Sequence, residues 1–166
     1  SMISADEAVE IILEHTEELQ TEVVNLPESL GRVLAADIRA AEDIPPFDNS
    51  SMDGFALRSI DTRSATASSP IKLSIVGVGP AGEAACLEVL PRTTVRIMPV
   101  APLPSNADAV LQQELAEEGE GSILVSAPVG VGTNVRPKGE DIVSGERVLA
   151  RGTRLRAGQL GVLASI

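Results

Sequence analysis

The segment from Ile44 to Phe55 constrains the fold more than any other part of this sequence. It reads Ile-Pro-Pro-Phe-Asp-Asn-Ser-Ser-Met-Asp-Gly-Phe and holds both Phe residues of a chain without Trp or Tyr. Two consecutive prolines fix φ and remove two backbone donors, and Asp, Asn and Ser side chains can bond neighbouring backbone N–H groups. We predict a rigid corner that presents the Asp53 carboxylate between two anchoring rings. The alternative is a linker followed by a hairpin turn, because Asp53-Gly54 is a pair favoured where a turn needs positive φ.

The charge balance argues against several classes of function. The 166 residues include 24 acidic and 13 Lys or Arg side chains, for a net charge of −11. Nucleic-acid binding needs clustered basic residues and stacking rings, so we expect no nucleic-acid partner. No apolar run approaches the roughly 20 residues of a membrane-spanning helix, and we expect no membrane partner. The single cysteine, Cys86, suits a reducing cytoplasm and is interpreted as a small packed side chain.

The chain begins with a clear helix signal. Ser4 and Glu7 form a capping box, and the apolar residues that follow recur at helical spacing. These features predict an N-terminal helix within residues 1–21. The β-favouring residues 21–24 predict a strand directly after it. His15 is interpreted as a surface side chain, because no Cys or second His accompanies it as a metal ligand.

From Gly31 onward the apolar pattern turns mostly to period two, which is typical of strands. The expected strands are 33–38, 71–75, 95–98, 109–111 and 123–125, with a strand end and tight turn at 76–82 and a hairpin tip at 114–121. We therefore predict a mainly β chain with strands at the spacing of a barrel or sandwich. The echo of residues 32–35 in residues 147–150, both Arg-Val-Leu-Ala, is too short to establish a repeat. It is compatible with flanking segments that return to one small sheet.

Four segments together form a pattern that resembles a known family. They are Gly31-Arg32-Val33-Leu34-Ala35, Pro45-Pro46-Phe47-Asp48-Asn49-Ser50-Ser51-Met52-Asp53-Gly54-Phe55-Ala56, Arg96-Ile97-Met98 with Ala107-Asp108-Ala109-Val110, and Asn134-Val135-Arg136 with Gly139-Glu140-Asp141-Ile142. In this order they are similar to the front part of molybdopterin molybdotransferase, the family of bacterial MoeA and the gephyrin E domain. The resemblance implies an N-terminal helix (1–21), a small split β linker domain (22–47 and 137–166) and an inserted β-barrel-like domain (48–136).

The resemblance also implies a reaction. The family enzyme takes adenylylated molybdopterin and molybdate, releases AMP with the help of Mg²⁺ and leaves molybdenum on the dithiolene. It works as a homodimer whose cleft lies between the β domain of one subunit and a nucleotide-fold domain of the other. The latter domain would begin just after Ile166, so we expect this chain to fold but not to turn over substrate alone. Its expected partners are a second copy, the adenylylated pterin and molybdate.

Four residues are the candidate site residues. By matching motifs, Asp53 and Asp141 occupy positions of acids in the family's cleft, where each would be a Mg²⁺ ligand or an electrostatic positioner. The alternative for each is a turn or capping aspartate. Glu114 is a weaker candidate for cofactor binding. Arg136 either pairs with Asp141 or faces the cleft.

One departure from the family pattern bears on activity. Pro99 and Val100 stand where the family usually has Thr and Gly. A hydroxyl and an N–H are thereby absent, and a β-branched residue resists the positive φ that glycine allows. Two hypotheses therefore stay open. The chain is either the substrate-cleft part of a molybdenum-insertion enzyme or part of a non-catalytic paralogue that acts as a dimeric scaffold or carrier.

Overall fold

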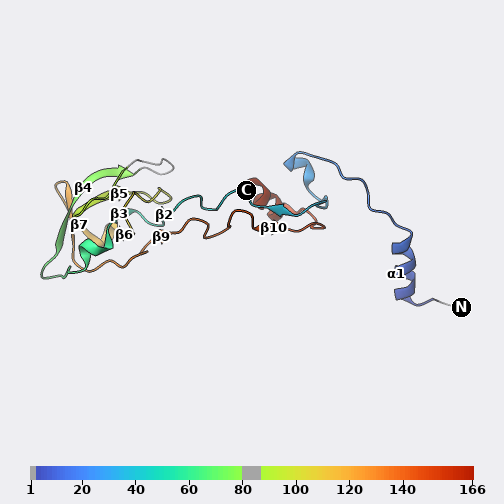
Figure 1. Cartoon of the computed structure of the whole chain (residues 1–166), viewed down its shortest axis with the longest axis horizontal. Coiled ribbons are helices and arrows are strands. Elements are labelled where there is room, and N and C mark those ends of the chain that lie inside the picture. Colours follow the sequence, from blue (N-terminus) through green and yellow to red (C-terminus); the bar gives the residue numbers. More distant parts are fainter. Residues whose placement is uncertain (1–2, 80–86) are drawn as a thin grey trace. The chain divides into compact units, whose positions relative to one another are not determined.

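The computed structural model describes residues 3–79 and 87–166 (Figure 1). Within them the fold is mainly β with a small helix at the N-terminus, as the sequence predicted. The elements in chain order are α1 (Ala5–Glu14), η1 (Leu26–Ser29), β1 (Ile38–Arg39), β2 (Asn49–Ser50), β3 (Gly54–Leu57), η2 (Ser59–Thr62), β4 (Ile71–Gly79), β5 (Thr93–Ile97), β6 (Ala109–Gln112), η3 (Gln113–Leu115), β7 (Ala116–Gly119), β8 (Ser122–Val125), β9 (Val135–Arg136), β10 (Arg147–Leu149) and α2 (Ala157–Ser165). Cys86 and residues 80–82 of the expected turn lie outside the described residues.

The largest element is a curled, half-barrel sheet of six strands in the order β6-β3-β5-β4-β8-β7 (Figure 1). The pair β4–β5 is parallel, and the other neighbours are antiparallel. Two further sheets have two strands each, β1 with β10 and β2 with β9. The second of these joins the segment of the predicted corner to the motif around Arg136, because Asn49 pairs with Arg136 and Ser50 with Val135.

Strand β3 lies between two hydrophobic clusters, and all four of its residues are buried. Phe55 and Leu57 belong to one cluster with Leu73, Leu111 and Ile123, while Ala56 belongs to the other with Ile97, Ala101 and Val110. This division follows from the strand geometry, which points successive side chains to opposite faces. Full burial of a side chain such as Phe55 stabilises the fold by roughly 1.5–3 kcal/mol.

The strand end predicted within 76–82 is present as the last part of β4, where Gly77 leaves room for the Leu87 side chain beside it. Two other predicted segments differ from the structure. Of the predicted strand 33–38, only Ile38 lies in a strand, β1, and Val33 makes an isolated bridge with Arg154. Residues 21–24 form no strand, and Val23 is fully exposed. Strand propensity gives no stability without a partner that supplies hydrogen bonds and packing. No strand pairs with residues 21–24 in the part of the chain that the structure describes.

The helix α1 is shorter than the predicted span of 1–21, since it ends at Glu14. The predicted capping box is present: Ser4 N donates to Glu7 Oε2 at 2.8 Å, and Glu7 N donates to Ser4 Oγ at 3.2 Å. No residue of α1 is buried. None of the helices in the described ranges is both long and apolar enough to cross a membrane.

The chain divides into two compact units. One takes in the described residues up to Ile38 with Leu149–Ser165, and the other takes in those of Arg39–Val148 with Ile166. In the first unit, Gly31 N donates to Leu155 O at 2.7 Å and Leu34 N donates to Thr153 O at 3.0 Å. The two flanks of the sequence are therefore paired, with residues 31–34 against 152–155. The predicted bounds of the split and inserted domains stay a prediction.

Gly54 does not have the positive φ that the Asp-Gly pair predicted. It is instead the first residue of β3, and a Cβ built on it would lie 2.0 Å from the backbone oxygen of Leu111 in β6. The glycine is required by the close approach of two strands, not by a turn. The hairpin-turn interpretation of Asp53-Gly54 is therefore wrong.

The substitution Gly54→Ala tests this constraint. Because the added methyl group meets backbone and not a flexible side chain, β3 and β6 must separate, and we expect the free energy of unfolding to fall by about 3 kcal/mol or more. Urea denaturation followed by circular dichroism measures the change. The matched control is Gly119→Ala in β7, where the atom nearest to the added Cβ would be Ser122 Oγ at 3.9 Å. The free energy of unfolding of this variant should stay within about 0.5 kcal/mol of the unsubstituted chain. Equal stabilities for the two variants would contradict the steric explanation.

Candidate functional site

The segment that carries Asp53 is held at Ser50. The Ser50 N–H donates to Ala101 O at 3.0 Å, and Val100 N donates to Ser50 O at 2.8 Å. The residue is only 1% exposed, and its hydroxyl donates to Met52 O at 2.6 Å and accepts from Met52 N at 3.3 Å. These bonds support the predicted rigid corner, which stays a prediction.

A second contact holds the same segment from Asn134, the residue before β9. The Ser51 N–H and its hydroxyl both donate to Asn134 O, at 3.0 and 3.1 Å. Asn134 has φ 55°, and its Nδ2 donates to Val110 O at 2.9 Å. Asparagine tolerates the left-handed region better than most residues, so its identity in the motif Gly-Thr-Asn-Val was a usable signal that the sequence analysis missed.

Asp53 itself follows this anchored segment and is exposed. Its backbone oxygen accepts from Gln113 N at 3.1 Å, which places it next to η3 and the neighbouring candidate Glu114, also exposed. The Asp53 carboxylate has no hydrogen-bond or ion-pair partner within residues 3–79 and 87–166. Of the two rings expected to flank it, Phe55 is fully buried, whereas Phe47 is 37% exposed. Only Phe55 is an anchor.

Arg136 and Asp141 are in direct contact. The guanidinium donates from Nε to Glu140 Oε2 and from a terminal nitrogen to Asp141 Oδ2, both at 2.8 Å. The hydrogen bonds that Arg136 donates to the Glu140 and Asp141 carboxylates raise the pKa of Arg136 above its ordinary value. Of the two alternatives that the sequence left open for Arg136, the ion pair is the one present.

The departure at Pro99-Val100 lies in a turn. Ala101 N donates to Met98 O at 3.2 Å across it, and Val100 has φ 65°. Proline at the second position and positive φ at the third are the pattern of a type II turn, whose third residue is normally glycine. Val100 therefore has a backbone conformation that favours glycine, and a β-branched residue in this conformation is strained.

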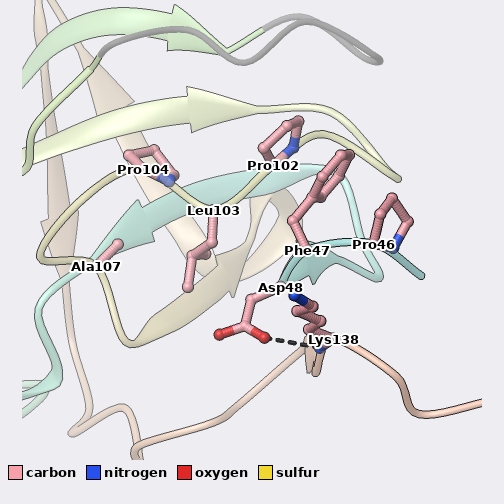
Figure 2. Close-up of a pocket in the computed structure, with 8 residues that line it drawn as sticks. All are labelled: Pro46, Phe47, Asp48, Pro102, Leu103, Pro104, Ala107 and Lys138. Carbon is pink, nitrogen blue, oxygen red and sulfur yellow. Dashed lines mark hydrogen bonds between the residues drawn. The ribbon is translucent and has the colours of Figure 1, made fainter. Parts of the chain in front are cut away.

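An open pocket of about 350 Å³ lies beside the same segment, lined by Pro46, Phe47, Asp48, Pro102, Leu103, Pro104, Ala107 and Lys138. In Figure 2 the rings of Pro46, Phe47 and Pro102 gather at one end of this pocket, and Asp48 and Lys138 lie below them. Asp48 Oδ1 accepts from Lys138 N at 2.7 Å, so this carboxylate bonds across the chain and not to its own neighbours as predicted.

The Lys138 side chain is also engaged. Its ammonium lies 3.1 Å from Asp43 Oδ2, and Ser144 N donates to Asp43 Oδ1 at 2.8 Å. The hydrogen bond from Ser144, with the one from Lys138, holds the pKa of Asp43 below its ordinary value. These contacts tie the Pro-Pro-Phe segment to residues 138–144. Nothing in the sequence pattern pointed to Lys138.

The four candidate residues therefore form two local pairs: Arg136 with Asp141 through their side chains, and Asp53 with Glu114 through the backbone of Gln113. Mg²⁺ is usually bound through one or two carboxylates together with substrate phosphates and water. The unshared Asp53 carboxylate fits such a ligand, whereas the Asp141 carboxylate shares the Arg136 guanidinium with Glu140. Across the described parts of the chain, no three His, Cys, Asp or Glu side chains come together as a metal site. The roles of all four residues stay predictions.

Comparison with known proteins decides the family. Residues 3–166 match the family model described as the MoeA N-terminal region (domain I and II). The chain belongs to this family. It is 36% identical over 168 residues to the molybdopterin molybdenumtransferase of Synechococcus elongatus, covering 99% of this chain and 42% of that protein. With its Bacillus subtilis counterpart it is 36% identical over 167 residues, covering 98% of this chain and 39% of that protein.

A solved structure agrees with this assignment. The crystal structure of the molybdopterin biosynthesis moeA protein from Pyrococcus horikoshii OT3 superposes with a TM-score of 0.93 at 37% identity, covering 99% of this chain and 44% of that chain. The resemblance expected from the sequence motifs is thus confirmed. This MoeA-family chain spans about two fifths of the length of the relatives it matches.

The strain at Val100 predicts an unusual response to glycine. Because the Val100 side chain is 61% exposed, Val100→Gly loses little packing and relieves the left-handed conformation, and we expect the free energy of unfolding to rise by about 1 kcal/mol. The matched control is Val78→Gly in β4, where the side chain is also exposed at 55%. In this variant the free energy of unfolding should fall by about 1 kcal/mol. Chemical denaturation of both variants measures the difference. If Val100→Gly were as destabilising as Val78→Gly, the turn would carry no strain.

Proposed function

We propose that this chain is the N-terminal part of a molybdopterin molybdotransferase. The complete enzyme inserts molybdenum from molybdate into adenylylated molybdopterin and releases AMP. The observation that carries the proposal is the family match over residues 3–166 together with relatives named molybdopterin molybdenumtransferase. The chain's contribution is a set of acidic side chains on a rigid loop, which complete a cleft whose anion-binding groups come from elsewhere.

The Asp53 carboxylate is the principal acid in this proposal. It is exposed and carries its charge without a partner among the described residues, while its backbone is held on both sides by hydrogen bonds. A carboxylate presented in this way would be free to hold Mg²⁺, which prefers oxygen ligands. When bound, the metal would neutralise negative charge that develops as AMP departs.

Asp141 has a different proposed role. Its carboxylate bonds the Arg136 guanidinium at 2.8 Å, so it would orient Arg136 and balance its charge, with Mg²⁺ binding as the second possibility. Arg136 is a bidentate donor that suits phosphate or carboxylate groups. Glu114, beside Asp53, is proposed as an auxiliary cofactor contact.

We further propose that the enzyme is a homodimer. This chain has a net charge of −11, whereas molybdate and a phosphorylated pterin are anions that require Arg, Lys or helix N-termini. A cleft built on this chain therefore needs basic groups from another domain, and a second subunit that faces Asp53 would supply them.

The alternative is a non-catalytic paralogue that serves as a scaffold or carrier. The observation that favours it is the turn Met98–Ala101, in which Pro99 offers neither a hydroxyl nor an N–H to a substrate. In such a protein the backbone geometry would persist while the chemistry is lost.

A chimeric enzyme tests both possibilities. We would join residues 1–166 to the remaining part of the Bacillus subtilis relative and measure AMP release from adenylylated molybdopterin in the presence of molybdate and Mg²⁺. Activity is the expected result. In that enzyme Asp53→Asn and Asp141→Asn should each lower kcat on the order of 100-fold, because each removes a fixed charge from the reacting region. Glu117→Gln, an exposed acid on β7, should leave the rate unchanged.

The controls make every outcome informative. A second chimera carries the corresponding segment of the Synechococcus elongatus relative, which tests the junction itself. If that chimera releases AMP and ours does not, the catalytic proposal is contradicted. Recovery of activity on replacing Pro99-Val100 by Thr-Gly would then support the non-catalytic alternative. Unchanged rates in both aspartate variants would remove the roles assigned to Asp53 and Asp141.

A further inference from the structure

Ser50 has the only buried hydroxyl among the described residues that bonds the segment next to Asp53. Its Oγ donates to Met52 O at 2.6 Å, and this carbonyl belongs to the peptide bond that leads into Asp53. The same oxygen accepts from Met52 N, so one hydroxyl closes a ring over the two residues before the acid. With the residue 1% exposed, water does not compete for these bonds.

Ser50 cannot shift to accommodate movement of its neighbours. Its N–H and carbonyl are both bonded to the turn Met98–Ala101, and on its other side it pairs with Val135 of β9. Because the Ser50 backbone is fixed in this way, its hydroxyl also holds the Met52 carbonyl in place.

Asp53 depends on such support, because its own side chain makes no bond within the described ranges. Its backbone is held before it by the Ser50 hydroxyl and after it by Gln113 N, which donates to Asp53 O at 3.1 Å. The next residue, Gly54, is fixed in the sheet. Loss of the first anchor leaves the Met52-Asp53 peptide free to rotate while the second anchor stays.

We propose that Ser50 is a positioning residue for Asp53, acting through the Met52 carbonyl; this inference rests on the proposed function of Asp53. Ser50 touches neither substrate nor metal in this account. Its hydroxyl keeps the carboxylate in the one orientation that serves the reaction, so its removal should lower kcat and leave KM nearly unchanged.

The first measurement concerns the 166-residue chain itself. Backbone ¹⁵N relaxation gives the order parameter of the Asp53 amide, which should fall from about 0.85 to below about 0.6 in Ser50→Ala. The matched control is Ser59→Ala, which removes another buried serine hydroxyl, bonded to Asp108 Oδ2 at 2.8 Å. That variant should lose similar stability and leave Asp53 rigid. Ser50→Cys, of similar size but with a weaker donor, should be intermediate and serves if Ser50→Ala does not fold.

The second measurement is AMP release by the Bacillus subtilis chimera. Ser50→Ala should reduce kcat about 10-fold or more with KM nearly unchanged, whereas Ser59→Ala should stay within about twofold. In the Asp53→Asn background, Ser50→Ala should have less than about a twofold further effect, because two residues that act through one group are not additive.

The outcomes separate this inference from the proposed function. An unchanged Asp53 order parameter in Ser50→Ala would overturn the positioning role, and so would a kcat reduction of equal size with and without Asp53→Asn. If Asp53→Asn itself left AMP release unchanged, the function assigned to Asp53 would fail, and the relaxation measurement would still decide whether Ser50 orders that residue.

Discussion

Two backbone hydrogen bonds between Ser50 and the turn Met98–Ala101 are the constraint on which the rest of the site depends. They fix a buried residue from which three structures continue: the loop that carries Asp53, the pairing of β2 with β9, and the start of β3 at Gly54. Each of these includes a contact between segments that are distant in sequence. Short-range features such as consecutive prolines make the loop stiff, but the long-range bonds decide where it points.

The sequence predicted much of this segment and the family, for physical reasons that can be named. Prolines and Asp, Asn or Ser residues restrict the local backbone, and the period-two pattern identified strands β4, β5, β6 and β8 where they pair. The sequence pattern failed where a residue distant in sequence determines the local structure. The need for Gly54 comes from the oxygen of Leu111 in β6. Residues 21–24 had strand propensity without a partner.

The site was less predictable than the fold. Motif matching proposed Asp53 and Asp141, and the sequence left open whether Arg136 pairs with Asp141, but it predicted no contacts for Asp53 or Glu114. The structure divides them into an ion-paired group at Arg136 and an unpaired acid at Asp53, which differ in their availability to a cation. Val100 is a separate case, since its φ of 65° is one that a β-branched side chain opposes.

Native-state hydrogen exchange of the backbone amides around Ser50 tests the central claim most directly, because slow exchange requires a persistent bond. The amides of Ser50 and Val100 bond each other's segments, and that of Gln113 bonds Asp53 O. We expect these three amides to exchange as slowly as those of β3 in the core, although all three lie outside the six-stranded sheet. Exchange at the rate of an exposed loop would contradict the claim that this segment holds Asp53 in place.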